Sequence, residues 1–188
     1  MTERPIMFKG PMVRAILDGT KTQTRRLCKP EHFNGSVMPT DSAMLNAIKW
    51  GCECPHGMTG DRLWVRETFC DQGCGRFLYR ASVENPEWKV RRWKPSIFMP
   101  RMASRIELEV TAIRASRLQD ISEEDAESEG AMTWWNGLSQ EEQFGMYDGG
   151  RGPIAAFRML WDSINAKRVV GWDTNPWVWA VSFRRVKP

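Results

Sequence analysis

The sequence has no long apolar run, and this absence limits where the protein can reside. None of its hydrophobic stretches approaches the roughly 18 consecutive apolar residues that a membrane-spanning helix needs. The first residues, MTERPIMFKGPMV, lack the basic start and apolar stretch of a secretory signal. We therefore expect a cytoplasmic protein that has no membrane partner.

Cysteine and histidine are scarce, with five and two residues respectively. An odd number of cysteines without a secretion signal argues against a disulfide framework. No C-x-x-C pair occurs, and the available zinc ligands are Cys52, Cys54, His56, Cys70 and Cys74. Their spacing is unlike that of common zinc knuckles. We expect no metal and no other cofactor, with a structural zinc at these residues as the alternative.

The remaining composition is that of an ordinary globular domain. Of 188 residues, 41% are hydrophobic and 27% are charged, which suffices for one domain with its own core. The net charge is +4, and the positive residues gather in clusters. These clusters are Arg25-Arg26, Lys89–Lys94, Arg101 with Arg105, and Arg184–Lys187. Such clusters permit a phosphate-facing surface, although solvated charge on ordinary faces explains them equally well.

Ten tryptophans are a heavy load for this length. Several alternate with apolar residues, which is typical of a core. Trp93 instead lies among basic residues in the run Lys89–Lys94. Aromatic rings beside cations are typical of single-stranded nucleic-acid sites, where a base stacks on the ring and the cation meets a phosphate.

The apolar pattern predicts several short strands and a few helices. A helix is expected over 10–17, with Pro11 in its first turn and Gly19 as a left-handed cap. A second helix is expected to begin after Ser122 and to stop at Gly130, and a third to begin at Pro153. The predicted strands are 61–69, 76–82, 96–100, 105–118 and 177–185, the last being central.

This mixture predicts an α+β fold, most simply a small closed or half-closed β-barrel with helices at its ends. We find no internal repeat. The chain therefore reads as a single domain over 1–188, with loop-like segments at about 30–59, 84–96 and 131–152 that are rich in Gly, Pro and polar residues.

The densest polar segment, GTKTQTRR, directly follows the first predicted helix. If this segment is extended, Thr22, Thr24 and Arg26 lie on one face, and Lys21, Gln23 and Arg25 lie on the other. A bend would bring the Lys21 amine to the Thr24 hydroxyl.

This segment resembles the signature of the ASCH family, whose pattern G-x-K-x-x-x-x-R is matched by Gly19, Lys21 and Arg26. The lead-in FKGPMVRAILDG, the segment 105–130 and the last predicted strand resemble other parts of the same domain. The resemblance implies a PUA-like small β-barrel with flanking helices. The three loop-like segments then look like insertions of the kind seen in longer bacterial and phage-borne members.

Some small members of the ASCH family are N4-acetylcytidine amidohydrolases that use a lysine, a threonine and a glutamate. Carried over by position, these residues are Lys21, Thr24 and Glu129. The resemblance thus implies a hydrolase whose partner is a nucleic acid, RNA more than DNA, or a modified nucleoside. Gly19, Arg25 and Arg26 would then bind the substrate.

The chemistry is sensible for these residue types. A threonine hydroxyl needs a base to remove its proton, and only about 0.04% of an ordinary lysine is free amine at pH 7. Lowering the lysine pKa by about 3 pH units through burial or a neighbouring cation would raise this fraction to roughly a quarter. Arg25 and Arg26 could supply the cation. Glu129 could protonate the leaving nitrogen or orient the lysine.

A second candidate site lies in the run GDRLWVRE, where the family has a turn and strand near its pocket. Trp64 could stack on a base, while Arg66 and Glu67 could line the pocket. The alternative is a strand with a buried tryptophan and an ion pair.

Two other functions could use the same residues in the same expected cleft. Lys21 and Arg26 could hold phosphate in an RNA- or DNA-binding module without turnover. The same lysine, arginine and glutamate could instead serve a ribonuclease, an activity ascribed to an ASCH-type protein.

Overall fold

The computed structural model describes residues 2–29, 54–83, 92–146 and 150–186. Its main element is a mixed five-stranded sheet. The strands are β1 (Glu3–Met7), β2 (Gln23–Leu27), β3 (Arg62–Arg66), β6 (Glu107–Arg117) and β7 (Trp177–Val186), in the spatial order β1-β3-β6-β7-β2. Strand β1 is parallel to β3, and the other neighbours are antiparallel.

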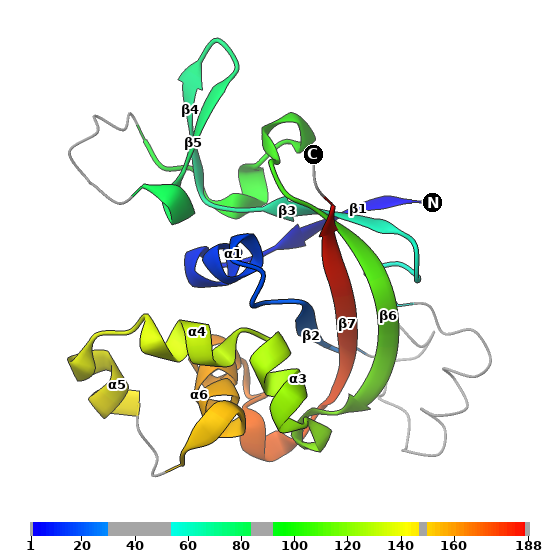
Figure 1. Cartoon of the computed structure of the whole chain (residues 1–188), viewed down its shortest axis with the longest axis vertical. Coiled ribbons are helices and arrows are strands. Elements are labelled where there is room, and N and C mark those ends of the chain that lie inside the picture. Colours follow the sequence, from blue (N-terminus) through cyan, green and yellow to red (C-terminus); the bar gives the residue numbers. More distant parts are fainter. Residues whose placement is uncertain (1, 30–53, 84–91, 147–149, 187–188) are drawn as a thin grey trace.

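Two further layers lie at opposite ends of this sheet (Figure 1). At one end is a hairpin of β4 (Phe69–Gly73) and β5 (Arg76–Tyr79). At the other end are α3 (Glu123–Ser128), α4 (Ala131–Asn136), α5 (Gln140–Met146) and α6 (Gly152–Asn165). Helix α1 (Gly10–Leu17) lies between the two ends.

Strand β7 is an interior strand of the sheet, as its sequence predicts. It pairs with β6 on one side and with β2 on the other. Residues Trp177–Val181 are all buried because both faces of the strand are covered there. A register shift between Val110 and Ala112 in β6 bends the sheet.

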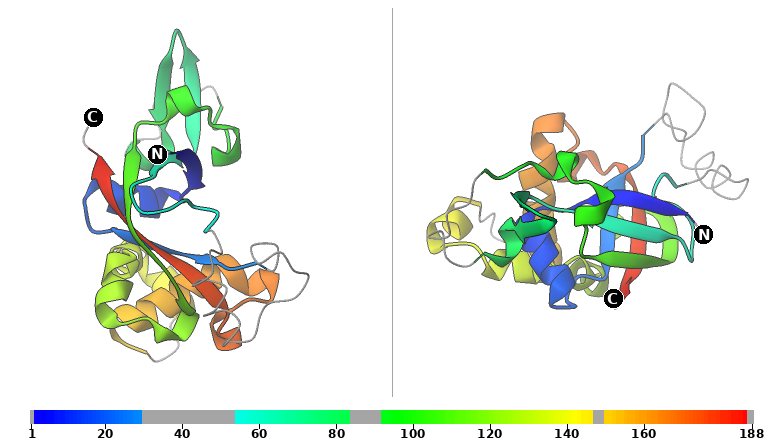
Figure 2. Two further views of the ribbon diagram at one scale, coloured as in Figure 1. Left: turned by 90° about the vertical axis from the view of Figure 1, so that its right-hand side faces the viewer. Right: turned by 90° about the horizontal axis from the view of Figure 1, so that it is seen from above.

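The fold is α+β, as predicted, and the barrel is half-closed (Figure 2). Within the described residues β1 and β2 are the two edges of the curved sheet, and no ladder joins them. A side chain spans the gap instead: Arg26 on β2 donates to the carbonyl oxygen of Met7 on β1 at 2.7 Å.

The hydrophobic core has two separate parts. The larger part joins the sheet to α1, α3, α4 and α6. The smaller part consists of Phe69, Met99 and Ala103, with Phe77 and Tyr79 packed on it, and belongs to the hairpin end. No helix within the described ranges is long and apolar enough to cross a membrane.

Several predicted elements are confirmed and a few are wrong. The first two expected helices begin and end near their predicted caps, with Gly19 and Gly130 at positive φ, and the third begins next to Pro153. The strand expected over 96–100 does not form, because Ser96–Phe98 is a 3₁₀ turn between two prolines. Strand β1 was not predicted at all, and the segment 131–152 contains two helices, α4 and α5. Most of the expected insertion at 30–59, and residues 84–91 and 147–149, lie outside the described residues.

Candidate functional site

Lys21 is placed by the turn that ends α1. Asp18 caps the helix, and Gly19 then adopts φ +78°, a conformation that glycine enters without steric cost. The turn returns the chain along the helix, so the Lys21 backbone N–H donates to the Ala15 carbonyl at 3.0 Å. The Lys21 side chain is thereby directed inward, where it is 3% exposed.

Glu129 is placed by the C-terminal end of α3. The helix begins at Ser122, whose hydroxyl accepts the Asp125 backbone N–H at 3.1 Å. It ends at Glu129, and Gly130 at φ +73° turns the chain into α4. A Cβ added to Gly130 would lie 3.2 Å from the Cβ atoms of both Ala15 and Lys21, so this glycine permits the two segments to approach closely.

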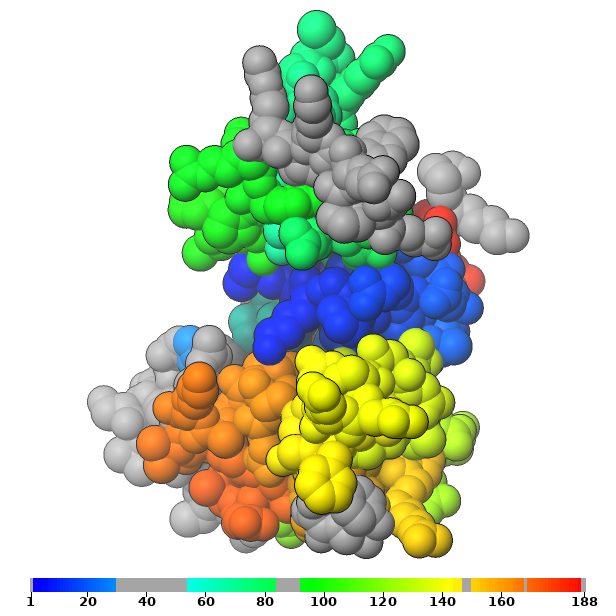
Figure 3. All heavy atoms as spheres, turned by 90° about the vertical axis from the view of Figure 1, so that its left-hand side faces the viewer, coloured from blue at the N-terminus to red at the C-terminus, as the bar shows by residue number. Residues whose placement is uncertain are grey.

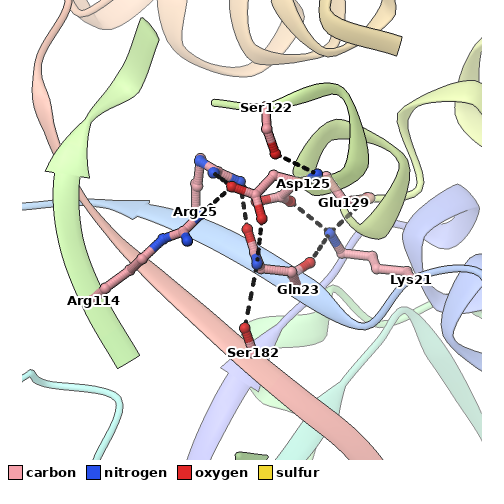
Figure 4. A network of polar contacts seen from close by, with 8 residues as sticks. All are labelled: Lys21, Gln23, Arg25, Arg114, Ser122, Asp125, Glu129 and Ser182. Atoms are coloured by element: carbon pink, nitrogen blue, oxygen red, sulfur yellow. Dashed lines mark hydrogen bonds and ion pairs between the residues drawn. The ribbon is translucent and has the colours of Figure 1, made fainter. Parts of the chain in front are cut away.

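The Lys21 amine and the Glu129 carboxylate meet in the interior (Figure 4). Nζ donates to Glu129 Oε2 at 2.8 Å, to the Glu129 carbonyl oxygen at 2.7 Å and to the Gln23 carbonyl oxygen at 2.7 Å. All three protons of the ammonium group therefore have an acceptor. The structure thus brings together two of the three catalytic residues implied by the ASCH resemblance.

Arg25 extends this pair into a network. Its guanidinium donates to Glu129 Oε1 at 3.3 Å, to Gln23 Oε1 at 2.6 Å and to Asp125 Oδ2 at 2.8 Å. Gln23 donates to Asp125 Oδ1 at 3.1 Å, and Arg114 on β6 also pairs with Asp125 (Figure 4). Gln23 and Arg25 share one face of β2, as the alternation predicts.

Sequence reasoning missed three members of this network: Gln23, Asp125 and Arg114. Asp125 lies in the first turn of α3, where the helix dipole alone would favour a carboxylate. The signal available was its position four residues before Glu129, which places both carboxylates on one face of α3. The alternation put Gln23 on the same face as Lys21 and Arg25 but gave it no role, and the position of Arg114 depends on the pairing of β6 with β7.

Burial governs the electrostatics of the site. Loss of water lowers the pKa of the Lys21 ammonium below its ordinary value. The Glu129 carboxylate opposes this shift, whereas the charges of Arg26 and Arg25 add to it. For Asp125, burial favours a higher pKa, but hydrogen bonds from Gln23 and Arg25 and the charges of Arg25 and Arg114 bring the net pKa below its ordinary value.

Thr24 and Arg26 lie one residue on either side of Arg25 in β2. Thr24 is 4% exposed, and its hydroxyl makes no hydrogen bond within the described part of the chain. Arg26 stacks on the Phe8 ring, 5.0 Å from the ring centroid, and the Lys21 amine is 5.7 Å from the same centroid. Phe8 therefore forms an apolar wall beside both cations.

The second predicted site has mainly architectural contacts. Arg66 donates to the carbonyl oxygens of Met99 and Ile97, and its guanidinium is 5.3 Å from the Trp64 ring centroid. Glu67 is buried and accepts two hydrogen bonds from Arg105 at 2.8 and 3.0 Å. No contact joins these side chains to Lys21 or Glu129 among the described residues.

The structure places four of the five suggested zinc ligands, and Cys52 lies outside the described residues. In the part of the chain that is described, no group of three His, Cys, Asp or Glu side chains is close enough to hold a metal ion.

A groove borders the elements that carry the network. It lies between α1 and α4, which are side by side in Figure 3, and has a volume of about 440 Å³. Its lining residues are Pro11, Arg14, Asp18, Thr133, Trp134, Asn136, Gly137 and Leu138. The Thr133 hydroxyl donates to the hydroxyl of Thr20, the residue before Lys21, at 3.1 Å.

No family model and no curated protein matches the sequence. Solved structures with a similar fold were found. One similar structure is an ASCH domain from Lactobacillus crispatus JV V101, at 15% identity and a TM-score of 0.43, over 98% of this chain and 79% of that chain. Another is a protein from Enterococcus faecalis V583 assigned to family model DUF984, at 11% identity and a TM-score of 0.45, over 99% of this chain and 80% of that chain.

Proposed function

We propose that this protein is a nucleoside- or nucleic-acid-directed amidohydrolase that removes the acyl group of N4-acylated cytidine. The observation that carries the proposal is the buried pair of Lys21 and Glu129, with the lysine pKa held below its ordinary value. Perturbed lysines in contact with a carboxylate are common where a proton must move. The resemblance of GTKTQTRR to the ASCH signature supports the substrate class.

In this reaction Thr24 is the nucleophile, Lys21 is the base, and either Glu129 or Lys21 is the acid. Neutral Lys21 takes the proton of the Thr24 hydroxyl as its oxygen attacks the acyl carbonyl carbon. The tetrahedral intermediate collapses, the C–N bond breaks, and Glu129 or the lysine ammonium gives a proton to the departing N4 nitrogen. Water then hydrolyses the acyl-threonine, so the products are cytidine and a carboxylic acid.

The buried site must open for this chemistry. Lys21 and Glu129 are each 3% exposed and Thr24 is 4% exposed, so substrate reaches them only after a local displacement. We assign entry to the groove between α1 and α4, because its 440 Å³ lies within the roughly 300–1,000 Å³ of small-molecule pockets. Displacing one of the three acceptors around Nζ would also favour loss of a proton from Lys21, because the neutral amine has only two N–H donors and a lone pair.

One observation favours a second function, nucleic-acid binding without turnover. All three Lys21 donors are satisfied by protein acceptors, which also suits a permanent structural ion pair. In that case the cleft would bind RNA or DNA, and no covalent bond would change.

Incubation with N4-acetylcytidine and, separately, with a short RNA distinguishes these functions. The amidohydrolase proposal expects release of cytidine and acetate, and intact RNA. The rate should rise with pH as Lys21 loses its proton and should level off below its ordinary pKa of 10.5. RNA cleavage would favour the ribonuclease instead, and no change in either compound would favour the binding module.

The Thr24→Ala variant tests the nucleophile, with Thr22→Ala as its matched control. Thr22 lies two residues away on the same side of the segment but is exposed. We expect Thr24→Ala to lower kcat by at least about 100-fold and Thr22→Ala to leave it unchanged. An unchanged rate in Thr24→Ala would show that the hydroxyl is not the nucleophile.

A further inference from the structure

The excess positive charge of this protein is concentrated in one stretch of chain. Residues 66–105 contain nine of the 27 Lys and Arg residues and four of the 23 Asp and Glu residues. The stretch therefore carries a formal charge of +5, and the rest of the chain carries −1. Its described part forms the hairpin end of the molecule, across α1 from the helices that hold Glu129 (Figure 1).

The hairpin end is a compact unit with its own support. Lys94 pairs with Phe69 through two backbone hydrogen bonds of 2.7 and 3.2 Å, which adds a third chain segment beside β4. Phe69, Met99 and Ala103 form the small core underneath. Side chains on this unit are therefore held at defined positions.

Three of its arginines are used to build the unit. Arg66 holds the carbonyl groups of Ile97 and Met99, and Arg101 pairs with Glu3 and Glu107. Arg105 pairs with Glu67 and lies 4.0 Å from the Tyr79 ring centroid. These cations are already neutralised or engaged.

The other arginines of the unit are not neutralised. Arg76, Arg80 and Arg92 are exposed, and none of them pairs with an acidic residue in the described ranges. Arg76 begins β5, and Arg80 directly follows its last residue, with its backbone N–H still bonded to the Thr68 carbonyl beside β4. Since alternate residues of a strand share a face, both arginines point to the same side of the hairpin.

Trp93 places an aromatic ring next to these cations. The Arg80 guanidinium lies 5.4 Å from the Trp93 ring centroid, and the ring is half-buried. Beyond it, Ile97, Phe98 and Met102 are 56%, 69% and 77% exposed on two successive 3₁₀ turns. Cations without a carboxylate partner, an accessible ring and exposed apolar side chains thus lie on one unit of the fold.

We propose that this hairpin end, through Arg76, Arg80, Arg92 and Trp93, is a docking surface for single-stranded nucleic acid. Unpaired cations match the phosphates, and the Trp93 ring offers a stacking face to a base that is not held in a duplex. The surface is separate from the buried network of Lys21, and its binding does not require that Lys21 be catalytic.

The test is binding of a labelled single-stranded oligouridine by fluorescence anisotropy over a series of salt concentrations. The double variant Arg76→Ala/Arg80→Ala should weaken binding and reduce the slope of log K against log salt by about 0.7 for each phosphate that is no longer neutralised. The variant Trp93→Phe should retain binding, whereas Trp93→Ala should bind about tenfold more weakly with the same slope.

The matched control is Arg151→Ala/Lys167→Ala, which removes two exposed cations near the ends of α6. Equal weakening by both double variants would overturn the proposal, because it would indicate net charge alone. So would an unaffected Trp93→Ala variant, equal affinity for duplex RNA, or binding to anionic phospholipid vesicles in place of oligouridine. Hydrolysis of free N4-acetylcytidine should be unchanged in the hairpin variants, so failure here and failure of the amidohydrolase proposal are separable.

Discussion

Lys21 carries its charge into a place with almost no water, and three oxygen acceptors replace its hydration shell. Taking an ion out of water costs several kcal/mol, so a buried pair contributes little net stability compared with apolar residues of the same shape. Removing only one partner is more costly, because the other charge stays buried. This asymmetry gives a direct test of how the pair is held.

We expect Lys21→Met to lower the free energy of unfolding by about 3–5 kcal/mol, since Glu129 then loses its closest ion-pair partner and keeps the more distant Arg25 at 3.3 Å. The double variant Lys21→Met/Glu129→Leu should recover most of this loss, because Arg25 retains Asp125 at 2.8 Å. Urea unfolding of both single variants and the double variant measures the coupling. Losses that simply add would contradict a coupled buried pair.

How far single residues could be predicted depended on whether their signal was local. The Lys21 and Glu129 pairing followed from matched motifs, whereas Asp125 and Gln23 joined the network through contacts about a hundred residues apart in the chain. Arg66 and Glu67 were recognised as notable, but their partners, Met99 and Arg105, could not be inferred from a strand pattern.

At the scale of elements, the glycines at helix ends were the most reliable guide to the secondary structure. Gly19 and Gly130 both have positive φ and end α1 and α3, and so fix the turns next to Lys21 and Glu129. The strand 177–185 was predictable because it is apolar on both faces. Strand β1 was not, because it contains Pro5 and is stabilised by parallel pairing with β3, far away in sequence.

Substituting Gly19 and Gly130 by alanine distinguishes the cost of a left-handed backbone from the cost of a steric clash. Gly19→Ala should destabilise by about 1–2 kcal/mol, the cost of a left-handed conformation, because nothing lies within 4 Å of the added Cβ. Gly130→Ala should cost more, because its Cβ would press on Ala15 and Lys21 at 3.2 Å. It should also lower hydrolysis by displacing the amine.

Thermal unfolding and N4-acetylcytidine turnover of the two variants measure this difference. Equal destabilisation would mean that the close approach of Gly130 to Lys21 places no constraint on the amine. A loss of activity in Gly19→Ala as large as that in Gly130→Ala would indicate that the turn, and not the contact, positions Lys21.

At the scale of the whole molecule, the two hydrophobic cores support different parts of the structure. The larger core supports the Lys21 network, and the smaller core supports the hairpin end. The α+β architecture was predictable from the alternation of short strands and helices, and the half-closed sheet was one of its two expected forms. The division into two cores was not, because Phe69, Met99 and Ala103 come together only through the 3₁₀ turns that replace the predicted strand at 96–100.

The division predicts that the two ends can be uncoupled by one substitution. Met99 is 1% exposed, its sulfur accepts the Glu67 backbone N–H, and its carbonyl accepts a hydrogen bond from Arg66. Met99→Ala removes about 2–5 kcal/mol of packing from the small core, so the hairpin should open locally. Hydrogen exchange should accelerate in β4 and β5 but not in β6 and β7, and oligouridine binding should fall while hydrolysis of free N4-acetylcytidine persists.

The control is Val178→Ala, in the main core, which should instead accelerate exchange throughout the chain. If Met99→Ala accelerates exchange in β6 and β7 to the same extent, the molecule unfolds as one unit and the two activities cannot be separated in this way.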